Sequence, residues 1–453
     1  MPIHSESSLP TRPPPSRAAV EHANTAPDYL IPKISSDPNP HRVFTHSRID
    51  AVLKGELQNA ELDNIPKLIH HLFPDSTLPA PPQKLLSYIE QSSEHLFKDG
   101  VWNVEPFSSD NFATPGQEEG CASFFNAIGA LCGLVAGMDL KRVWVSKCNT
   151  PLPGIPAVRK PDLTLFDNVS NGTVIKAKSI LMSAMKPFKT DKKYDEHQSY
   201  TTVRATCQVK SGIHLESDAK EELMQDAYFT FSRQDGRRYV LGVTFCATQI
   251  GLSLFDRAGS LHSTSFEINE QPLTFVRLLA GLSFASRTSI GYDPTIQGKG
   301  QRRILVENDW YEILGVEFIN DVIRGRGTTC YHVAKDGVEY AIKDVWVDTS
   351  RLPGEVALLD AARHIKGVPT CVAHATVKVD GREDSTAWPR ECIEESTPCY
   401  SSLKNIETRS HRRLLISPFA SPLVNFKNKI EFLGVLRDAI RGKCPARHKH
   451  IYP

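Results

Sequence analysis

The stretch Val322–Trp346, VIRGRGTTCYHVAKDGVEYAIKDVW, constrains the possible folds of this chain more than any other. It holds Gly325 and Gly327 and, further on, the turn pair Asp336-Gly337 between two apolar, β-branched runs. An Asp-Gly pair in this setting predicts a β-hairpin, because a type I′ turn needs a positive φ at both central residues. The stretch therefore predicts a strand, a glycine loop, a second strand, a tight turn and a third strand that carries Lys343.

The segment after this hairpin supplies a carboxylate as a partner for the lysine. Arg351–Ile365 predicts a helix, with Glu355 near its start. In a kinase-type nucleotide cleft, glycines let backbone N–H groups approach the phosphates, and a lysine held by a glutamate contacts the same phosphates. Gly325, Gly327, Lys343 and Glu355 are therefore the candidate nucleotide-binding residues. A plain hairpin with two turn glycines and a structural lysine is the alternative.

Composition and charge are those of a globular protein. Of the 453 residues, 40% are hydrophobic and 23% are charged, and the length fits about two to three domains. A net charge of +1 gives no general attraction to nucleic acid or membranes, so neither is an expected partner. We see no apolar run long enough to span a bilayer and no secretion signal. The ten cysteines include no Cys-x-x-Cys pair, so we expect reduced thiols in an intracellular protein, cytoplasmic or nuclear.

The chain divides into five segments. Residues 1–42 are rich in proline, serine and histidine and predict a disordered leader, because they hold too little apolar surface to offset the entropy of ordering. The others are a helical segment at 43–100, a mixed α/β domain at 101–300, an incomplete small lobe at 305–441 and a tail at 442–453. The predicted fold class is α+β: an antiparallel sheet with one helix, preceded by a mixed α/β domain and a helical or disordered leader.

Hydrophobic periodicity and turn residues predict the elements of these segments. The predicted helices are roughly 48–62, 65–72, 83–97, Glu118–Val135, Ala219–Phe231, Pro272–Phe284 and Asn428–Arg441. The predicted strands include Arg142–Val145, Pro161–Asp167, Thr201–Lys210, Arg238–Phe245, Gly251–Asp256 and Arg412–Ser417. The polar stretch Asn168–Tyr200 predicts an exposed loop or hairpin, and Asp380–Thr397 predicts an inserted loop.

A second group of polar residues lies in the predicted α/β domain. Asp162 follows Pro161 on one strand, and Gln208 and Lys210 share a face of another, because alternate residues of a strand point the same way. The group resembles the Pro-Asp…(Asp/Glu)-x-Lys nuclease superfamily, in which two acids hold a divalent cation and a lysine orients water. Here the second acid is the neutral Gln208, a weaker ligand for a hard cation. The alternative is a structural ion pair between Asp162 and Lys210.

Several longer blocks together resemble the fungal-type protein kinase family. They are QDGRRYVLG at 234–242, LFDRAGS at 254–260, IGYDPTI at 290–296, RGRGT at 324–328, YAIKDVW at 340–346 and RDAI at 437–440. The blocks occur in the family's order, and the resemblance covers roughly Lys160–Arg441. It implies a kinase amino-terminal lobe, with ATP and Mg²⁺ as cofactors, and phosphoryl transfer to serine or threonine of an unknown protein substrate.

The resemblance assigns roles to the candidate residues. Gly325 and Gly327 would cover the phosphates, Lys343 would contact the α- and β-phosphates, and Glu355 would hold Lys343 by an ion pair. The strand before Pro418–Pro422 would lead to a hinge beside the adenine, formed by those residues.

The sequence also departs from the family. Cys330 stands at the third glycine position of the loop, and His332 at the usual valine position. After Asn428–Arg441, where the catalytic and metal-binding loops are expected, the chain reads GKCPARHKHIYP. We therefore expect a member truncated before the catalytic loop, with no catalytic residue and no turnover. The alternatives are a pseudokinase-like protein-interaction module and a metal-dependent nuclease using the Asp162 group.

Overall fold

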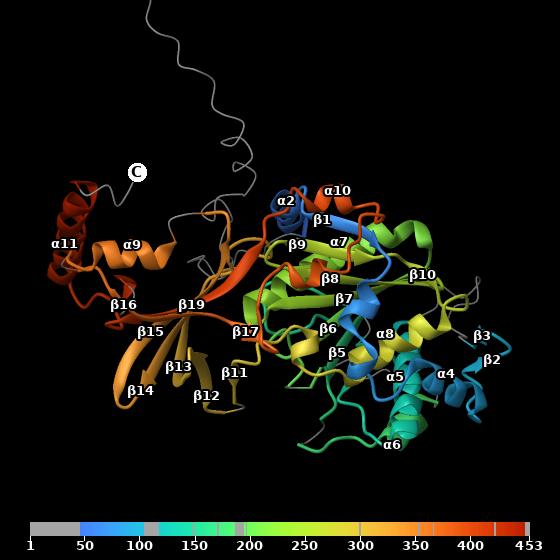
Figure 1. Cartoon of the computed structure of the whole chain (residues 1–453). Helices are drawn as coiled ribbons and strands as arrows, with labels where there is room; N and C mark the ends of the chain where they lie inside the picture. Colours follow the sequence, from blue (N-terminus) through green and yellow to red (C-terminus); the bar gives the residue numbers. More distant parts are fainter. Residues whose placement is uncertain are drawn as a thin grey trace, which may run out of the picture.

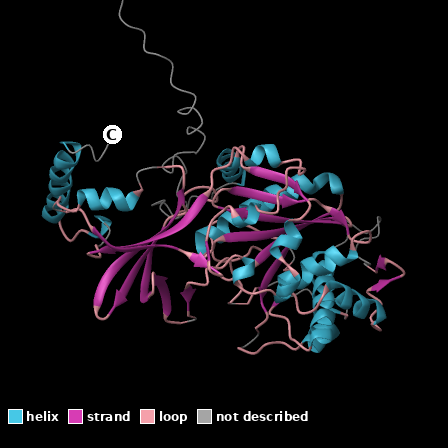
Figure 2. Ribbon diagram, viewed as in Figure 1, coloured by secondary structure: helices cyan, strands magenta, loops and turns pink. Residues whose placement is uncertain are grey.

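The computed structural model describes residues 46–103, 117–147, 150–169, 172–185, 194–195, 197–298, 300–351, 354–365, 367–420 and 423–448. These residues form two sheets that lie next to each other (Figure 1). One is a mixed sheet flanked by helices, and the other is a curled antiparallel sheet (Figure 2). The combination of helices with a mixed sheet and an antiparallel sheet confirms that the fold class is α+β, as predicted. The predicted disordered leader 1–42 lies outside the described residues.

The mixed sheet has eight strands in the order β1-β9-β8-β7-β6-β5-β4, with β10 paired to β8. Its strands are β1 (Glu61–Ile65), β4 (Arg142–Val145), β5 (Leu163–Asp167), β6 (Ala205–Lys210), β7 (Tyr239–Cys246), β8 (Gln249–Asp256), β9 (Gly259–Ser263) and β10 (Phe266–Glu267). The pairs β1/β9 and β6/β7 are parallel, and the other pairs are antiparallel. A separate short hairpin joins β2 (Phe97–Lys98) to β3 (Val101–Trp102).

Helices cover both faces of the mixed sheet. They are α2 (His46–Leu57), α3 (Leu68–Leu72), α4 (Pro82–Gln91), α5 (Gln117–Ala136), α6 (Ala177–Ala184), α7 (Glu216–Arg233) and α8 (Pro272–Phe284). Strand alternation divides the apolar residues between two cores. In β5, Leu163 and Leu165 join the core that contains α5 and α8 residues, whereas Phe166 joins the core that contains α2 and α7 residues.

Helix α5 is the one helix, among the residues the structure describes, that is long and apolar enough to be a candidate membrane span. We predicted from the sequence that no apolar run is long enough to span a bilayer, and that prediction was wrong. However, 72% of the candidate window is buried inside the structure. Such burial is typical of the core helix of a globular domain, which agrees with the predicted buried helix Glu118–Val135.

The antiparallel sheet has seven strands in the order β11-β12-β13-β14-β15-β19-β16. They are β11 (Ile296–Gln297), β12 (Arg302–Val306), β13 (Asp309–Ile319), β14 (Thr329–Lys335), β15 (Val338–Asp348), β16 (Thr370–Thr376) and β19 (Arg409–Ser417). Helix α9 (Glu355–Ala362) follows β15 and contacts β16, and helix α11 (Lys429–His448) follows β19. The predicted hairpin is confirmed, because Asp336 and Gly337 join β14 to β15 with φ of 52° and 77°.

Several element predictions were wrong. The predicted helices 48–62 and 65–72 included residues 61, 62 and 65, yet Glu61–Ile65 is the edge strand β1, because pairing with β9 buries Leu62 and Ile65. The polar stretch 168–200 contains helix α6, which packs on α5. The predicted helix Arg351–Ile365 is limited to α9.

The insert between β16 and β19 connects the two sheets. It contains the hairpin β17 (Lys378–Val379) and β18 (Arg382–Glu383), a 3₁₀ turn at Trp388–Arg390 and helix α10 (Tyr400–Leu403). Its Cys392, Ile393 and Cys399 are buried in the core of the mixed sheet. Arg390 also forms a buried ion pair with Asp256 of β8, with 2.5 Å between Nη1 and Oδ2. The predicted inserted loop, Asp380–Thr397, therefore packs against the mixed sheet and links it to the antiparallel sheet.

Candidate functional site

An ion pair between β15 and α9 forms the centre of the candidate site. Lys343 Nζ donates to both carboxylate oxygens of Glu355 at 2.6 Å. The lysine side chain is 21% exposed and the glutamate side chain 37% exposed, so one face of the pair is open to solvent. Glu355 is the first residue of α9, where the helix dipole favours a negative charge. The structure therefore brings the two predicted residues together in the expected pair.

A cavity of about 230 Å³ lies beside this pair, between α9 and the sheet. Its lining includes Glu355, Val345, Val347, His374, Arg412 and Leu414. A second cavity of about 360 Å³ lies elsewhere, between α3, the start of β7 and the β17–β18 hairpin. The first cavity is the better candidate because its lining includes Glu355, the ion-pair partner of Lys343.

The face of β14 next to Lys343 carries an aromatic stack. His332 and Phe419 are stacked with ring centroids 3.7 Å apart and planes 6° apart. In the β14/β15 register, Cys330 lies opposite Lys343 and His332 lies opposite Ala341. Residues two apart on a strand share a face, so His332 lies on the same face as Lys343.

The glycine segment between β13 and β14 is held by the mixed-sheet domain. Gly325 N donates to the carbonyl of Arg257 at 2.9 Å, and Arg257 Nη1 donates to the carbonyl of Val322. Gly327 has φ of 48°, and a Cβ there would lie 2.4 Å from Arg257 Nε. Glu56 of α2 accepts from the backbone N–H groups that precede Gly325. The Gly325 N–H is therefore engaged within the protein, and phosphate contact by these glycines stays a prediction.

The second candidate group is assembled in the mixed sheet. Asp162 Oδ2 accepts from Val209 N, and Gln208 Nε2 donates to Asp226, both at 2.8 Å. Lys210 Nζ forms its ion pair with Glu222, 2.8 Å away, in place of the expected pair with Asp162. Gln208 is fully buried, and its Oε1 has no hydrogen-bond partner.

Glu118 of α5 also lies near this group, and sequence reasoning missed it. Burial, together with the nearby charge of Asp162, raises the pKa of Glu118 to about 7. Burial raises the pKa of Asp162 to about 6, although Lys210 opposes the shift. A carboxylate whose pKa is raised by burial and by a neighbouring carboxylate favours a shared proton or a cation. The signal in the sequence was an acid at the start of a strongly apolar helix.

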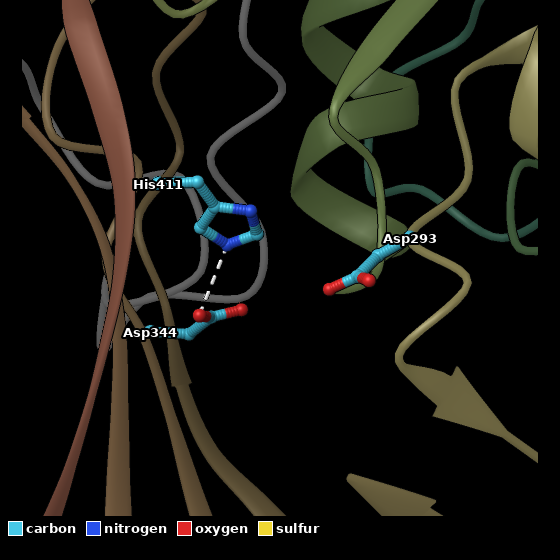
Figure 3. A group of neighbouring side chains, drawn as sticks. All are labelled: Asp293, Asp344 and His411. Atoms are coloured by element: carbon cyan, nitrogen blue, oxygen red, sulfur yellow. Dashed lines mark hydrogen bonds and ion pairs between the residues drawn. The ribbon is translucent and has the colours of Figure 1, made fainter. Parts of the chain in front are cut away.

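A buried ionic network joins the two sheets, and Figure 3 shows three of its members, Asp293, Asp344 and His411. Arg413 of β19 donates to Asp344 of β15 at 3.0 Å and to Asp293 at 2.8 Å. His411 lies between Asp344, 3.0 Å from Nε2, and Asp384, 2.9 Å from Nδ1. Asp293, Asp344 and His411 are close enough together to hold a metal ion. However, the Arg413 guanidinium already bonds both of these carboxylates, so the network is complete without a metal.

Stability should depend on the charge of His411 in this network. Asp344 and Asp384 raise the pKa of His411 to about 9 against the opposing effect of burial. A histidine with a raised folded-state pKa stabilises the fold fully below the unfolded value, about 6.5, and loses that effect as the pH passes the folded value. We therefore expect the free energy of unfolding to fall by about 3 kcal/mol from pH 6 to pH 10 through this group.

Urea unfolding of wild type and His411→Gln at several pH values measures this effect. The variant should lack the decrease that passes through pH 9. A wild-type decrease that the variant retains in full would contradict the assignment to His411.

Comparison with known protein families gives one match. The family model for the fungal protein kinase matches residues 179–444, more than half of the chain. The chain therefore belongs to the fungal protein kinase family. The matched region begins in α6 and includes both the antiparallel sheet and most of the mixed sheet. No curated protein and no solved structure matches the chain.

Proposed function

We propose that the antiparallel sheet, α9 and the segment after β19 form a nucleotide-binding half-cleft of the protein kinase type, which takes ATP with Mg²⁺. The Lys343–Glu355 ion pair is the observation that carries this proposal, because it fixes a lysine ammonium on a partly exposed face of the antiparallel sheet. Support also comes from the order of elements: strand, glycine segment, strand, tight turn, lysine strand and glutamate helix.

The chain's residues would divide the ligand between them. Lys343 would contact the phosphates as a point charge, and Glu355 would hold the lysine side chain extended toward those phosphates. His332, two residue pairs along the sheet from Lys343, would offer a flat face to the base. Bound Mg²⁺ would offset the charge of the phosphate oxygens. In the glycine segment, the Gly325 N–H would have to break its hydrogen bond to the Arg257 carbonyl before it could donate to a phosphate.

The activity of the family is phosphoryl transfer, which depends on positioning and on charge stabilisation around the transferred phosphate. The candidate residues of this chain supply part of that requirement, namely nucleotide contacts. The proposal for this polypeptide is therefore ATP binding, with protein phosphorylation as the family's reaction.

Calorimetric titration of the purified chain with Mg-ATP tests this proposal. We expect saturable binding to one site per chain. No detectable heat or thermal stabilisation at millimolar nucleotide would contradict it, and would favour the alternative of a protein-interaction module.

A second candidate function is divalent-cation binding, with nuclease chemistry, at the Asp162 group. The observation that favours it is a further carboxylate, Glu118 of α5, whose pKa is raised by burial and by the nearby charge of Asp162. The unpartnered Oε1 of Gln208 is a further oxygen without a donor. Against it, Lys210 and Gln208 are both engaged by acids of α7.

Manganese binding separates this candidate from a structural acid cluster. If the candidate is right, Asp162→Ala should weaken Mn²⁺ binding at least about tenfold, because a hard cation loses a charged oxygen ligand. Metal-dependent cleavage of DNA should disappear in the same variant. Asp139→Ala is a matched control, since Asp139 pairs with Lys176 on the exposed surface. Equal Mn²⁺ binding by wild type and Asp162→Ala would eliminate the candidate.

A further inference from the structure

The stack of Phe419 on His332 is an unusual contact for a site that is expected to bind a ligand. The rings are parallel within 6°, and their centroids lie 3.7 Å apart, which is van der Waals contact over the whole ring face. The two rings come from distant parts of the chain: His332 from β14, and Phe419 from the segment that follows β19.

The histidine is the fixed member of this stack. His332 Nε2 lies 3.0 Å from Glu339 Oε2, and the side chain is 19% exposed on a strand paired on both sides. Phe419 lies beyond the last residue of β19 and is half-buried, between the exposed residues Pro418 and Ala420. Rotation of Phe419 away from His332 therefore requires no change in the sheet.

The stack lies where the base of a nucleotide would lie if the phosphates of that nucleotide bound Lys343. His332 and Cys330 are two residues apart on one face of β14, and Cys330 lies opposite Lys343. This spacing along a strand is about 7 Å. A ligand with its anionic end on Lys343 would therefore bring a flat base to His332, where Phe419 now lies.

We propose that Phe419 is an intramolecular occupant of the base position, so that a nucleobase and the Phe419 ring compete for the same face of His332. This inference rests on the proposed function and adds its regulation: the chain binds nucleotide only when the segment after β19 releases Phe419. The apparent dissociation constant for ATP then equals the intrinsic constant divided by the fraction of molecules in which the Phe419 ring is displaced.

Adenosine and tripolyphosphate each carry one half of ATP, so they separate competition at the base position from phosphate binding. Phe419→Ala should tighten ATP binding by about three- to tenfold, the range expected when one aromatic stacking contact no longer competes. Adenosine binding should tighten by the same factor, whereas binding of Mg-tripolyphosphate should not change. His332→Ala should weaken ATP and adenosine binding about tenfold, because the base loses its stacking face.

Matched variants guard against an effect on folding. Phe426 contacts Phe432 with the two rings tilted by 46° and is 45% exposed, so Phe426→Ala removes a phenylalanine from the same part of the chain without opening the His332 face. It should leave ATP affinity unchanged. Phe419→Leu keeps an apolar side chain but removes the flat ring, and it should tighten ATP binding as Phe419→Ala does. Circular dichroism and thermal unfolding confirm that each variant is folded.

The outcomes distinguish the two proposals. Tighter ATP and adenosine binding in both Phe419 variants, with unchanged tripolyphosphate binding, supports the inference. If wild type binds ATP and the Phe419 variants bind it equally or more weakly, the inference is wrong and the proposed function stands. If no folded variant binds ATP or tripolyphosphate, the proposed function itself is overturned.

Discussion

Replacing Arg413 with methionine should lower the free energy of unfolding by about 3–5 kcal/mol, the usual cost of leaving buried charges without their partner. Arg413 is fully buried and bonds Asp293 and Asp344, which come from the two sides of the junction between the sheets. Methionine has a similar length but no charge, so the two carboxylates would repel each other in a medium of low polarity. Urea unfolding at pH 7 measures the difference.

Two further variants test the electrostatic cause. Arg412→Met changes the neighbouring arginine of β19, which is exposed, and should alter stability by less than about 0.5 kcal/mol. Adding Asp293→Asn to Arg413→Met should restore part of the loss, because it removes the carboxylate that has lost its charged partner. A loss in Arg413→Met no larger than that in Arg412→Met would show that the ionic network does not stabilise the junction.

Replacing Lys343 with methionine should weaken Mg-ATP binding by about 10- to 100-fold, the range for a charge-assisted hydrogen bond. The variant removes the ammonium that would contact phosphate and leaves the Glu355 carboxylate, 37% exposed, to repel it. The pair is partly solvated, so we expect little loss of stability from the same change. Calorimetric titration of both proteins gives the two dissociation constants.

Lys335→Met is the matched control for this prediction. Lys335 lies on β14, also in an ion pair, but with Asp309 at the hairpin end of the sheet. Its removal should leave ATP affinity unchanged. If Lys343→Met binds ATP as tightly as Lys335→Met does, Lys343 does not contact the nucleotide.

The parts of the site that sequence analysis predicted are those fixed by local chemistry. The hairpin followed from Asp336-Gly337, because a type I′ turn tolerates few other residue pairs. The Lys343–Glu355 pair followed from the order of a lysine strand and a helix that begins with an acid. Both depend on residues close together in the chain, so neither required knowledge of the tertiary structure.

The remaining parts depend on contacts between distant segments. The sequence gives no pattern that pairs Arg413 with Asp293, since the two are brought together by the packing of one sheet against the other. The stack of Phe419 on His332 likewise depends on the path of the chain after β19. Strand β1 was missed because its pairing partner lies far along the sequence, in β9. Tertiary pairing of this kind overrides local propensity.

Photolabelling with 8-azido-ATP tests the central claim most directly, because the azide reacts where the base binds. After digestion and mass spectrometry, we predict nucleotide-protected labelling in peptides that contain His332 or Phe419, and loss of that labelling in Lys343→Met. Labelling confined to peptides of the mixed sheet, or labelling that excess ATP does not reduce, would contradict the assignment of the nucleotide site to the antiparallel sheet.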